Sequence, residues 1–518
     1  MKVLLLEHPR GRSANHFNDI ANTPLSSCLI SGYIASLLQA NDIETDILDA
    51  YLGRYSFDQM VEDVVNKEYD VLGIHLVYSW EHTPAVLLAI DEIGSRIGVP
   101  ILAYGFYPTF AYDSILKSHP SIDCVITGEP EYAFLEFCVK TQKGRDPGAI
   151  DGLAFRHDGD RIAYNRRKTI DQLDQLPFPY RTNDHMKHVG GNILGSRGCY
   201  GNCTFCYINH FYGKRCNWRG RTAENIIQEL QTILSRIPVR YIYFIDANFF
   251  GPGDDGQDRA IDMAERLQSE KGLEFGLECR VNDIQEQSLK ALAHAGLTDV
   301  FLGVESGSKR SLKRMRKGTT VEQGVSAIRL LRDHGIEPHT GFIMFESDST
   351  LQDIRDNFNF LYSNRLLNRL TTTVDLLYHP QIVLMGMDSY QTLLKKNRMR
   401  FFSDNVYQGT FSFKDGRVYW MAEVMASLCH QILEFMNNRD SPIYWRRNCL
   451  NNDHHSCRMA DRINRWLVVF FEDLLKRLEC RDMICTDDLK DHYMHESMNF
   501  IRETISGSVV SEQPDDQQ

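Results

Sequence analysis

The sequence predicts an α/β fold in three successive parts: a doubly wound, Rossmann-like sheet, a partial (β/α)6 barrel of the TIM type and a helical region. Short apolar runs alternate with helix-length amphipathic segments over the first 140 residues, and the same alternation restarts near residue 189. After residue 377 the apolar pattern is that of amphipathic helices alone. The chain of 518 residues is also longer than one hydrophobic core usually allows, which favours several domains.

Residues 1–140 form the first part, where five strands and four helices are expected. The strands are expected at residues 3–7, 44–49, 71–76, 101–104 and 124–127, and the helices at 25–40, 57–66, 83–97 and 131–140. An open parallel sheet binds its ligands beyond the carboxyl ends of its strands. We therefore expect a cofactor beside the loops that carry Ser79, Gly105, Gly128 and Glu129.

Residues 141–188 predict a connecting segment, because Pro, Gly and charged residues follow no helix or strand period there apart from a hairpin expected at Asp158-Gly159. The barrel is expected over residues 189–377, with strands at 192–196, 240–245, 274–279, 299–304, 338–345 and 371–377. Its chemistry should lie at the carboxyl ends of these strands. Residues 378–505 predict a helical domain, with helices at 421–436 and 459–478, and residues 506–518 a disordered tail.

The composition is that of an ordinary globular protein, with 43% hydrophobic and 24% charged residues. A net charge of -12 without a long run of Lys and Arg argues against a nucleic-acid partner. The longest apolar stretch near the C-terminus, residues 466–471, is far shorter than a membrane span of about 20 residues. We therefore expect a cytoplasmic protein, whose thirteen cysteines stay reduced and serve metal or redox chemistry where they cluster.

Three cysteines cluster tightly, at Cys199, Cys203 and Cys206, directly after a predicted strand. Thiolates are the usual ligands of iron–sulfur clusters, and a loop this short can turn all three toward one cluster. Three ligands leave one iron of a four-iron cluster open to a substrate or cofactor. A zinc site is the alternative, with His210 or Cys216 as the fourth ligand.

The spacing of these three cysteines, followed by Tyr207, resembles the signature of the radical S-adenosylmethionine (SAM) superfamily. Four later segments resemble further landmarks of that superfamily in the same order: residues 243–248, 277–282, 303–307 and 315–318. The resemblance implies a [4Fe–4S] cluster whose open iron binds SAM. It also implies that six residues contact SAM: Tyr207, Asp246, Asn248, Arg280, Glu305 and Ser306. As alternatives, Asp246 and Asn248 could cap a turn, and Arg280 could belong to an ordinary ion pair.

The first 140 residues resemble the cobalamin-binding domain of cobalamin (B12)-dependent radical SAM enzymes, through Pro24-Leu25 and residues 69–74 and 123–131. The resemblance implies cobalamin at the carboxyl edge of the sheet, near the four loop residues named above. The loop after the first strand, residues 8–13, lacks the Asp-x-His-x-x-Gly pattern of other cobalamin proteins. His8 is therefore expected to be a turn residue, and the cobalt to have no protein histidine. A domain that has lost its cofactor is the alternative.

The same resemblance implies a C-methyltransferase that acts on an unactivated carbon of a small or natural-product-like substrate, through a 5′-deoxyadenosyl radical and methylcobalamin. It also implies an electron donor such as flavodoxin or ferredoxin. Two alternatives stay open. One is a B12-dependent radical cyclase or rearrangement enzyme that acts on a tetrapyrrole or secondary metabolite, and the other is a non-catalytic cobalamin-binding sensor. No catalytic residue is assigned beyond the three cysteines.

Overall fold

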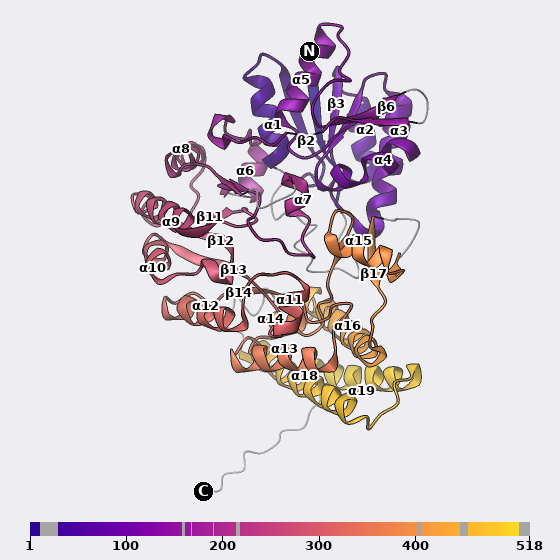
Figure 1. The fold of residues 1–518 in the computed structure, drawn as a ribbon, viewed down its shortest axis with the longest axis vertical. Coiled ribbons are helices and arrows are strands. Elements are labelled where there is room, and N and C mark those ends of the chain that lie inside the picture. Colours follow the sequence, from indigo (N-terminus) through magenta and orange to yellow (C-terminus); the bar gives the residue numbers. More distant parts are fainter. Residues whose placement is uncertain are drawn as a thin grey trace.

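The computed structural model describes residues 1–10, 29–157, 161–166, 168–189, 191–213, 218–401, 407–445 and 454–506. Pro24-Leu25, the turn expected at Asp158-Gly159 and the expected tail from residue 507 onward lie outside these ranges. Figure 1 shows a sheet domain at the N-terminal end of the molecule, a second sheet in its middle and long helices at the opposite end. The predicted α/β fold with its three parts is confirmed.

The N-terminal sheet has seven strands in the order β2-β1-β3-β4-β5-β6-β7. Their bounds are β1 (Lys2–Glu7), β2 (Glu44–Asp49), β3 (Val71–His75), β4 (Ile101–Tyr104), β5 (Cys124–Ile126), β6 (Leu153–His157) and β7 (Arg161–Tyr164). The first five are parallel and lie where the sequence predicts them. β6 and β7 come from the expected connecting segment and extend the sheet as an antiparallel hairpin. The order of the strands reverses between β1 and β3, where open sheets bind their ligands.

Helices cover both faces of this sheet, because its strands carry apolar side chains on both sides. α1 (Leu29–Gln39) and α5 (Glu131–Gln142) pack on the face that carries Val3 and Leu5. α2 (Phe57–Val65), α3 (Thr83–Arg96) and α4 (Phe106–Ser118) pack on the face that carries Leu4 and Leu6. The four expected helices are confirmed where the structure describes them.

α4 is a correction, because the sequence predicts a loop at residues 105–107. The structure begins a helix at Phe106, immediately after β4. Gly105 makes this short connection with a φ of 119°, and a Cβ there would lie 2.5 Å from the Leu76 carbonyl oxygen. A residue without a side chain is therefore required where the helix begins.

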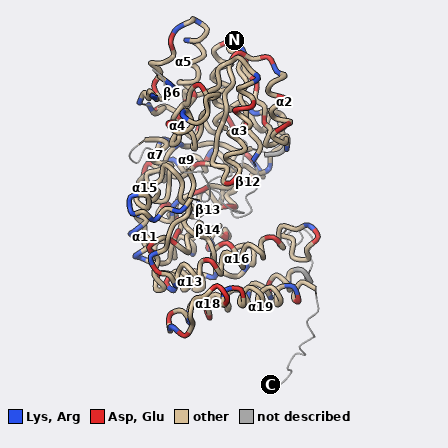
Figure 2. Tube along the Cα trace, turned by 90° about the vertical axis from the view of Figure 1, so that its right-hand side faces the viewer, with Lys and Arg blue, Asp and Glu red and all other residues tan. Residues whose placement is uncertain are grey.

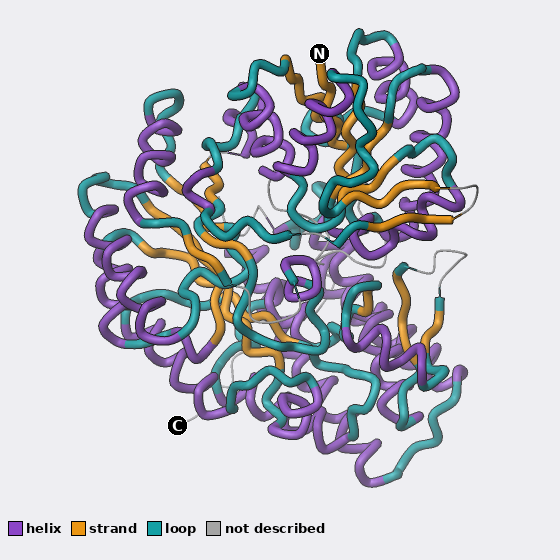
Figure 3. The backbone as a smooth tube through the Cα atoms, turned by 45° about the horizontal axis from the view of Figure 1, so that its top comes forward, coloured by secondary structure: helices purple, strands orange, loops and turns teal. Residues whose placement is uncertain are grey.

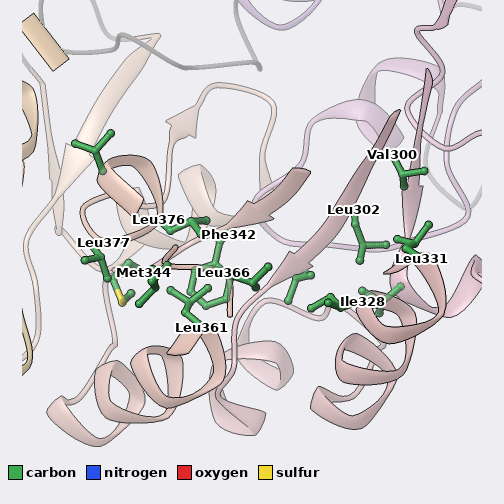
Figure 4. Close-up of a cluster of buried hydrophobic side chains, with 14 of the residues drawn as sticks. Val300, Leu302, Ile328, Leu331, Phe342, Met344, Leu361, Leu366, Leu376 and Leu377 are labelled. Atoms are coloured by element: carbon green, nitrogen blue, oxygen red, sulfur yellow. The ribbon is translucent and has the colours of Figure 1, made fainter. Parts of the chain in front are cut away.

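The second sheet has five parallel strands in the order β14-β13-β12-β11-β8. They are β8 (Gly191–Ile193), β11 (Tyr241–Phe244), β12 (Glu274–Arg280), β13 (Leu297–Glu305) and β14 (His339–Phe342). The helices that pack on it are α8 (Ala223–Leu234), α9 (Gly253–Leu267), α10 (Glu286–His294), α12 (Val321–Asp333) and α13 (Leu351–Ser363). Figure 4 shows part of the shared core, where Val300 and Leu302 of β13 face Ile328 and Leu331 of α12. In Figure 3 the two strand arrays form separate sheets, each with its own helices.

The sixth expected strand of the barrel, residues 371–377, is wrong, because this segment forms α14 (Leu370–Leu376). Its three threonines and Val374 have β-branched side chains that favour a strand. The segment packs instead against α18 (His454–Cys480), with Val374 and Leu376 in the shared core, and this packing outweighs the local preference. The sixth position of the sheet is a single parallel bridge between Phe345 and Pro380, and a proline has no N–H to extend a ladder.

The C-terminal region combines long helices with a small antiparallel sheet that the sequence does not predict. The helices are α16 (Gly416–Asn437), α18 and α19 (Asp487–Ser506), and the sheet contains β15 (Val383–Leu384), β16 (Met399–Arg400) and β17 (Gln408–Phe411). This sheet packs on the N-terminal domain, where the rings of Tyr107 and Tyr407 lie 4.7 Å apart. No helix in the described ranges is long and apolar enough to cross a membrane. The domain boundaries at residues 140, 188 and 377 stay a prediction.

Buried ion pairs join the N-terminal domain to the barrel. Arg197, in β9 (Ser196–Arg197), donates to Glu129 Oε1 at 2.9 Å and to Glu131 Oε1 at 2.6 Å. Arg219, in β10 (Arg219–Gly220), donates to the other oxygen of Glu129 at 2.8 Å. The four side chains are at most 9% exposed. Because a buried charge without a partner is costly, these pairs determine how the two domains meet.

Replacing Arg197 should therefore weaken the whole interface. In Arg197→Met, Glu131 loses its cation inside the protein, and we expect the urea midpoint to fall by the equivalent of about 3 kcal/mol. Arg96→Met is the matched control, because Arg96 and Glu62 form an ion pair at the surface of the same domain. An equally small shift in both variants would contradict the importance of the buried pairs.

Candidate functional site

The cysteine loop, residues 198–207, connects β9 to α7 (Ile208–Tyr212). Cys199, Cys203 and Cys206 are all partly buried. Two backbone hydrogen bonds hold the centre of the loop, since Thr204 N donates to the Met315 carbonyl at 2.9 Å and Ser389 N donates to the Thr204 carbonyl at 2.8 Å. The loop is thus fixed between the end of α11 (Lys309–Arg314) and the start of α15 (Asp388–Lys395).

The three thiols lie close to one another and to a cation. Burial raises the pKa of Cys206 to about 12, and the charges of Cys203 and Cys199 add to this rise. Arg280 Nη1 lies 3.6 Å from Cys203 Sγ, and the Gly201 N–H donates to Cys199 Sγ at 3.3 Å. Both donors favour the thiolate, which is the form that binds a metal. These donors offset part of the effect of burial, and a bound metal would supply the further stabilisation that the thiolates need.

His210, the histidine that a zinc site would use, is held by a carboxylate through one of its ring nitrogens. Its Nε2 hydrogen-bonds Asp388 Oδ1 at 2.8 Å, and Cys216 lies outside the described residues. Within the ranges that the structure describes, no set of three or more Cys, His, Asp or Glu side chains is arranged to hold a metal ion. The ligands of an iron–sulfur cluster bind different irons and need not converge on one point.

Asp246 and Asn248 follow β11, and they differ in whether a side-chain atom is left without a hydrogen-bond partner. Asp246 is fully buried, its Oδ2 accepts from Gly195 N at 3.0 Å, and its Oδ1 has no hydrogen-bond partner in the described part of the chain. Burial raises the pKa of Asp246 to about 6. The amide of Asn248 is engaged at both atoms, by Asp283 at 2.6 Å and by Gly251 N at 2.9 Å. Asp246 can thus accept a donor from a ligand, whereas Asn248 braces its loop.

Arg280 ends β12 and braces the cysteine loop. Its Nη2 donates to the carbonyl of Lys317, and its guanidinium lies 5.3 Å from the centre of the Tyr200 ring. Gly201 leaves room for it, because a Cβ there would lie 2.4 Å from Arg280 Nη1. Arg280 is therefore more than an ordinary ion-pair member, since its cation faces the sulfur of Cys203.

Glu305 ends β13 with a φ of 68°, a strained conformation for a residue with a side chain and one that is common at functional sites. Its Oε1 accepts from Lys317 Nζ at 2.8 Å, and Lys317 is only 5% exposed. Ser306 is engaged elsewhere, since its Oγ donates to Asn357 Oδ1 at 2.6 Å. Lys317 belongs to one of the segments that carry the resemblance, but the sequence indicated no role for it.

Sequence reasoning also missed Tyr243 and Glu278. Phe275, Leu277 and Cys279 of β12 lie in the core beneath the helices, so Glu278 and Arg280 point to the opposite face of the strand. Tyr243 Oη, on β11, donates to Glu278 Oε1 at 3.5 Å. Burial, followed by the charge of Asp246, raises the pKa of Glu278 to about 7. The sequence did contain one sign of this arrangement, because Glu278 is a charged residue between two apolar residues of a predicted strand.

Tyr207 connects the cysteine loop to the carboxyl edge of the N-terminal sheet. Its ring centre lies 5.0 Å from that of Phe106, at the start of α4, and 5.9 Å from that of Tyr78, after β3. The Tyr78 hydroxyl donates to the carbonyl of Met385 in the C-terminal region. The loop therefore packs directly against the edge where the sequence predicts a cofactor.

The four residues expected beside cobalamin lie on that edge, but their polar groups have protein partners. Gly128 N donates to Thr109 Oγ1 at 2.9 Å, and Glu129 pairs with Arg197 and Arg219. Ser79 is 9% exposed, and Gly105 is required by the close approach of the Leu76 carbonyl. Glu129 thus serves the domain interface.

Unpartnered polar atoms lie instead at the reversal point between β1 and β3. His8 directly follows β1, is fully buried and donates from Nδ1 to the Pro9 carbonyl at 2.8 Å, so its Nε2 is an acceptor. Burial lowers the pKa of His8 to about 3, which keeps the ring neutral. Arg10 donates from Nη2 to Glu7 at 2.6 Å. Among the described residues, His8 Nε2 and Arg10 Nε and Nη1 have no partner.

The chain matches the Radical SAM superfamily over residues 193–361. Among solved structures, that of the cobalamin-dependent S-adenosylmethionine radical enzyme OxsB, with aqua-cobalamin and S-adenosylmethionine bound, is similar to this chain with a TM-score of 0.69. The similarity covers 98% of this chain and 84% of OxsB at 19% sequence identity.

Two curated relatives have names that indicate different reactions, a methyl transfer and a cyclisation. An uncharacterized methyltransferase, PH0819, of Pyrococcus horikoshii is 28% identical over 70% of this chain and 77% of its own length. An anaerobic magnesium-protoporphyrin IX monomethyl ester cyclase of Rubrivivax gelatinosus is 26% identical over 63% of this chain and 60% of its own length. Residues 193–361 therefore form a radical SAM domain, and the whole chain has the fold of the cobalamin-dependent enzyme OxsB.

Proposed function

We propose that this chain is a cobalamin-dependent radical SAM C-methyltransferase that acts on a small or natural-product-like substrate. The observation that carries the proposal is the contact of Tyr207 with Phe106 and Tyr78, which sets the cysteine loop against the carboxyl edge of the N-terminal sheet. Groups bound at these two places would lie close to each other. The relative named a methyltransferase supports the reaction type.

The residues present fit a cluster and SAM. Cys199, Cys203 and Cys206 would ligate the cluster, with the Arg280 guanidinium beside Cys203. Asp246 Oδ1 is a buried acceptor without a partner in the described chain, which suits an ammonium group of SAM. The Glu305–Lys317 pair offers an acceptor and a donor at the neighbouring strand end.

The residues at the β1–β3 reversal point fit a large polar cofactor such as cobalamin. His8 Nε2 is a buried acceptor, and Arg10 Nε and Nη1 are buried donors, all without a partner in the described chain. When bound, cluster, SAM and cobalamin would supply the radical and the methyl group of the reaction, while the protein binds, orients and excludes water.

We also propose a cytoplasmic location and an electron donor of the flavodoxin or ferredoxin type. The ten cysteines that the structure describes are all free, as in a reducing compartment. A radical cyclase is the second candidate function, because three curated relatives carry that name.

Iron content tests the cluster ligands. The anaerobically reconstituted protein should hold about four iron atoms per chain, and Cys199→Ala, Cys203→Ala and Cys206→Ala should each lose most of them. Cys138→Ala is the matched control, because Cys138 is buried in α5, within the N-terminal domain. Full iron in the three loop variants, or about eight atoms in the parent protein, would refute a single cluster at this loop.

Labelled SAM tests the methyl transfer. We expect the reconstituted protein to retain corrinoid absorbance after incubation with hydroxocobalamin and desalting. Under reducing conditions, label from methyl-labelled SAM should then appear on the bound corrinoid. Retained corrinoid with no transferred label would favour the cyclase, and loss of the corrinoid would remove cobalamin from the proposal.

Glu278 makes stability depend on pH. Its pKa in the folded protein, about 7, exceeds its ordinary value of 4.5. The free energy of unfolding therefore falls as pH rises from about 4.5 to about 7, and it stays at the lower value above that range. Glu278→Gln should therefore raise the melting temperature of the metal-free protein more at about pH 8 than at about pH 5. Glu274→Gln, exposed on the same strand, is the control. A pH-independent difference would contradict this assignment.

A further inference from the structure

A depression of about 520 Å³ lies on the surface beside the cysteine loop. Its lining includes Asn202, Lys309, Lys313, Arg316, Gly318 and Glu322. Asn202 is exposed and stands next to Cys203 in the chain. The depression thus opens to solvent, whereas Tyr207, at the end of the same loop, is buried against the N-terminal domain.

The depression is positively charged on a protein of net charge -12. Residues 309–317 contain six Lys or Arg in nine positions, and Figure 2 shows the blue segments gathered at α11. Lys317, together with the two arginines of α11, pairs with buried or partly buried carboxylates. Lys309, Lys313 and Arg316 are exposed on the depression.

The carboxylates near these three cations leave an excess of positive charge. Lys309 pairs with Glu322 at 2.7 Å, and Arg316 pairs with Asp388. Lys313 has no ion pair among the described residues. A cluster of exposed cations at a concave site attracts an acidic partner and steers its approach.

The wall of the depression is connected to the thiols by short links. Gly318 follows Lys317, whose carbonyl accepts from Arg280 Nη2, and Arg280 Nη1 lies 3.6 Å from Cys203 Sγ. The Met315 carbonyl, at the end of α11, accepts from Thr204 N inside the cysteine loop. A partner in the depression would therefore lie next to the cysteine loop and within a short path of the Cys203 sulfur.

We propose that this depression is the docking site of the electron donor, a small acidic ferredoxin that presents carboxylates around its own cluster. The inference rests on the proposed function, because it needs a cluster at the three cysteines. One electron would leave the reduced ferredoxin and enter the cluster that Cys199, Cys203 and Cys206 would hold, with no bond made or broken and no proton moved.

Rapid-mixing reduction of the reconstituted enzyme tests the site. A reduced, acidic bacterial ferredoxin is the probe, and dithionite is the comparison because it needs no protein docking surface. In Lys309→Glu/Lys313→Glu the rate with ferredoxin should fall about tenfold at low salt, with the rate for dithionite unchanged. The difference should shrink at high salt, which screens exposed charges.

Lys67→Glu is the matched control for the single variant Lys313→Glu. Lys67 is also an exposed lysine without an ion pair among the described residues, and it lines a depression of about 450 Å³ on the N-terminal domain, which includes Lys2 and Arg96. Slower ferredoxin reduction in Lys313→Glu but not in Lys67→Glu would support the docking site.

Two results would overturn the inference. Unchanged ferredoxin rates in the double variant would place the donor elsewhere, and equal losses with ferredoxin and dithionite would make the lysines supports of the cluster. Both results can be interpreted only if the parent enzyme holds iron and is reduced by dithionite. A parent protein without iron would instead contradict the proposed function, so the two failures are distinguishable.

Discussion

The burial of Arg197 between Glu129 and Glu131 is the interaction on which the rest of the structure depends. Each carboxylate comes from the edge of the N-terminal sheet, and Arg197 stands two residues before Cys199. Charges removed from water are stable only with close partners, so the domains have few alternative ways to meet. These ion pairs therefore fix the first cysteine of the loop relative to the edge of the N-terminal sheet.

Three further contacts hold the loop from other directions. Tyr207 packs on Phe106, the end of α11 accepts a hydrogen bond from Thr204, and Ser389 of the C-terminal region donates to Thr204. The C-terminal region also reaches the N-terminal domain through Tyr407. The loop is therefore positioned by all three parts of the chain.

Local pattern was enough to predict most of the fold, because the parallel strands are short apolar runs buried on both sides. It failed at residues 371–377, where a run of β-branched side chains packs as a helix against α18, and at Phe106, where Gly105 allows an immediate helix start. The cysteine spacing was enough to predict the radical SAM domain that residues 193–361 match, whereas the ligands themselves stay a prediction. The roles around it were not predictable, because Glu129 and Arg197 are 68 residues apart and only the fold pairs them.

The charges around the thiols suggest why two cations are buried beside this loop. Burial alone would lower the pKa of Arg280, but the sulfurs of Cys203 and Cys199 outweigh this effect and raise it. Lys317 behaves likewise, because Glu305 and then Cys203 outweigh its burial. Two permanent cations thus face the side where three thiolates would gather, while Asp246 and Glu278 face the interior with raised pKa values. The fold therefore supplies positive charge where a metal-bound loop would be most negative, and burial brings the pKa values of the two interior acids closer to neutral pH.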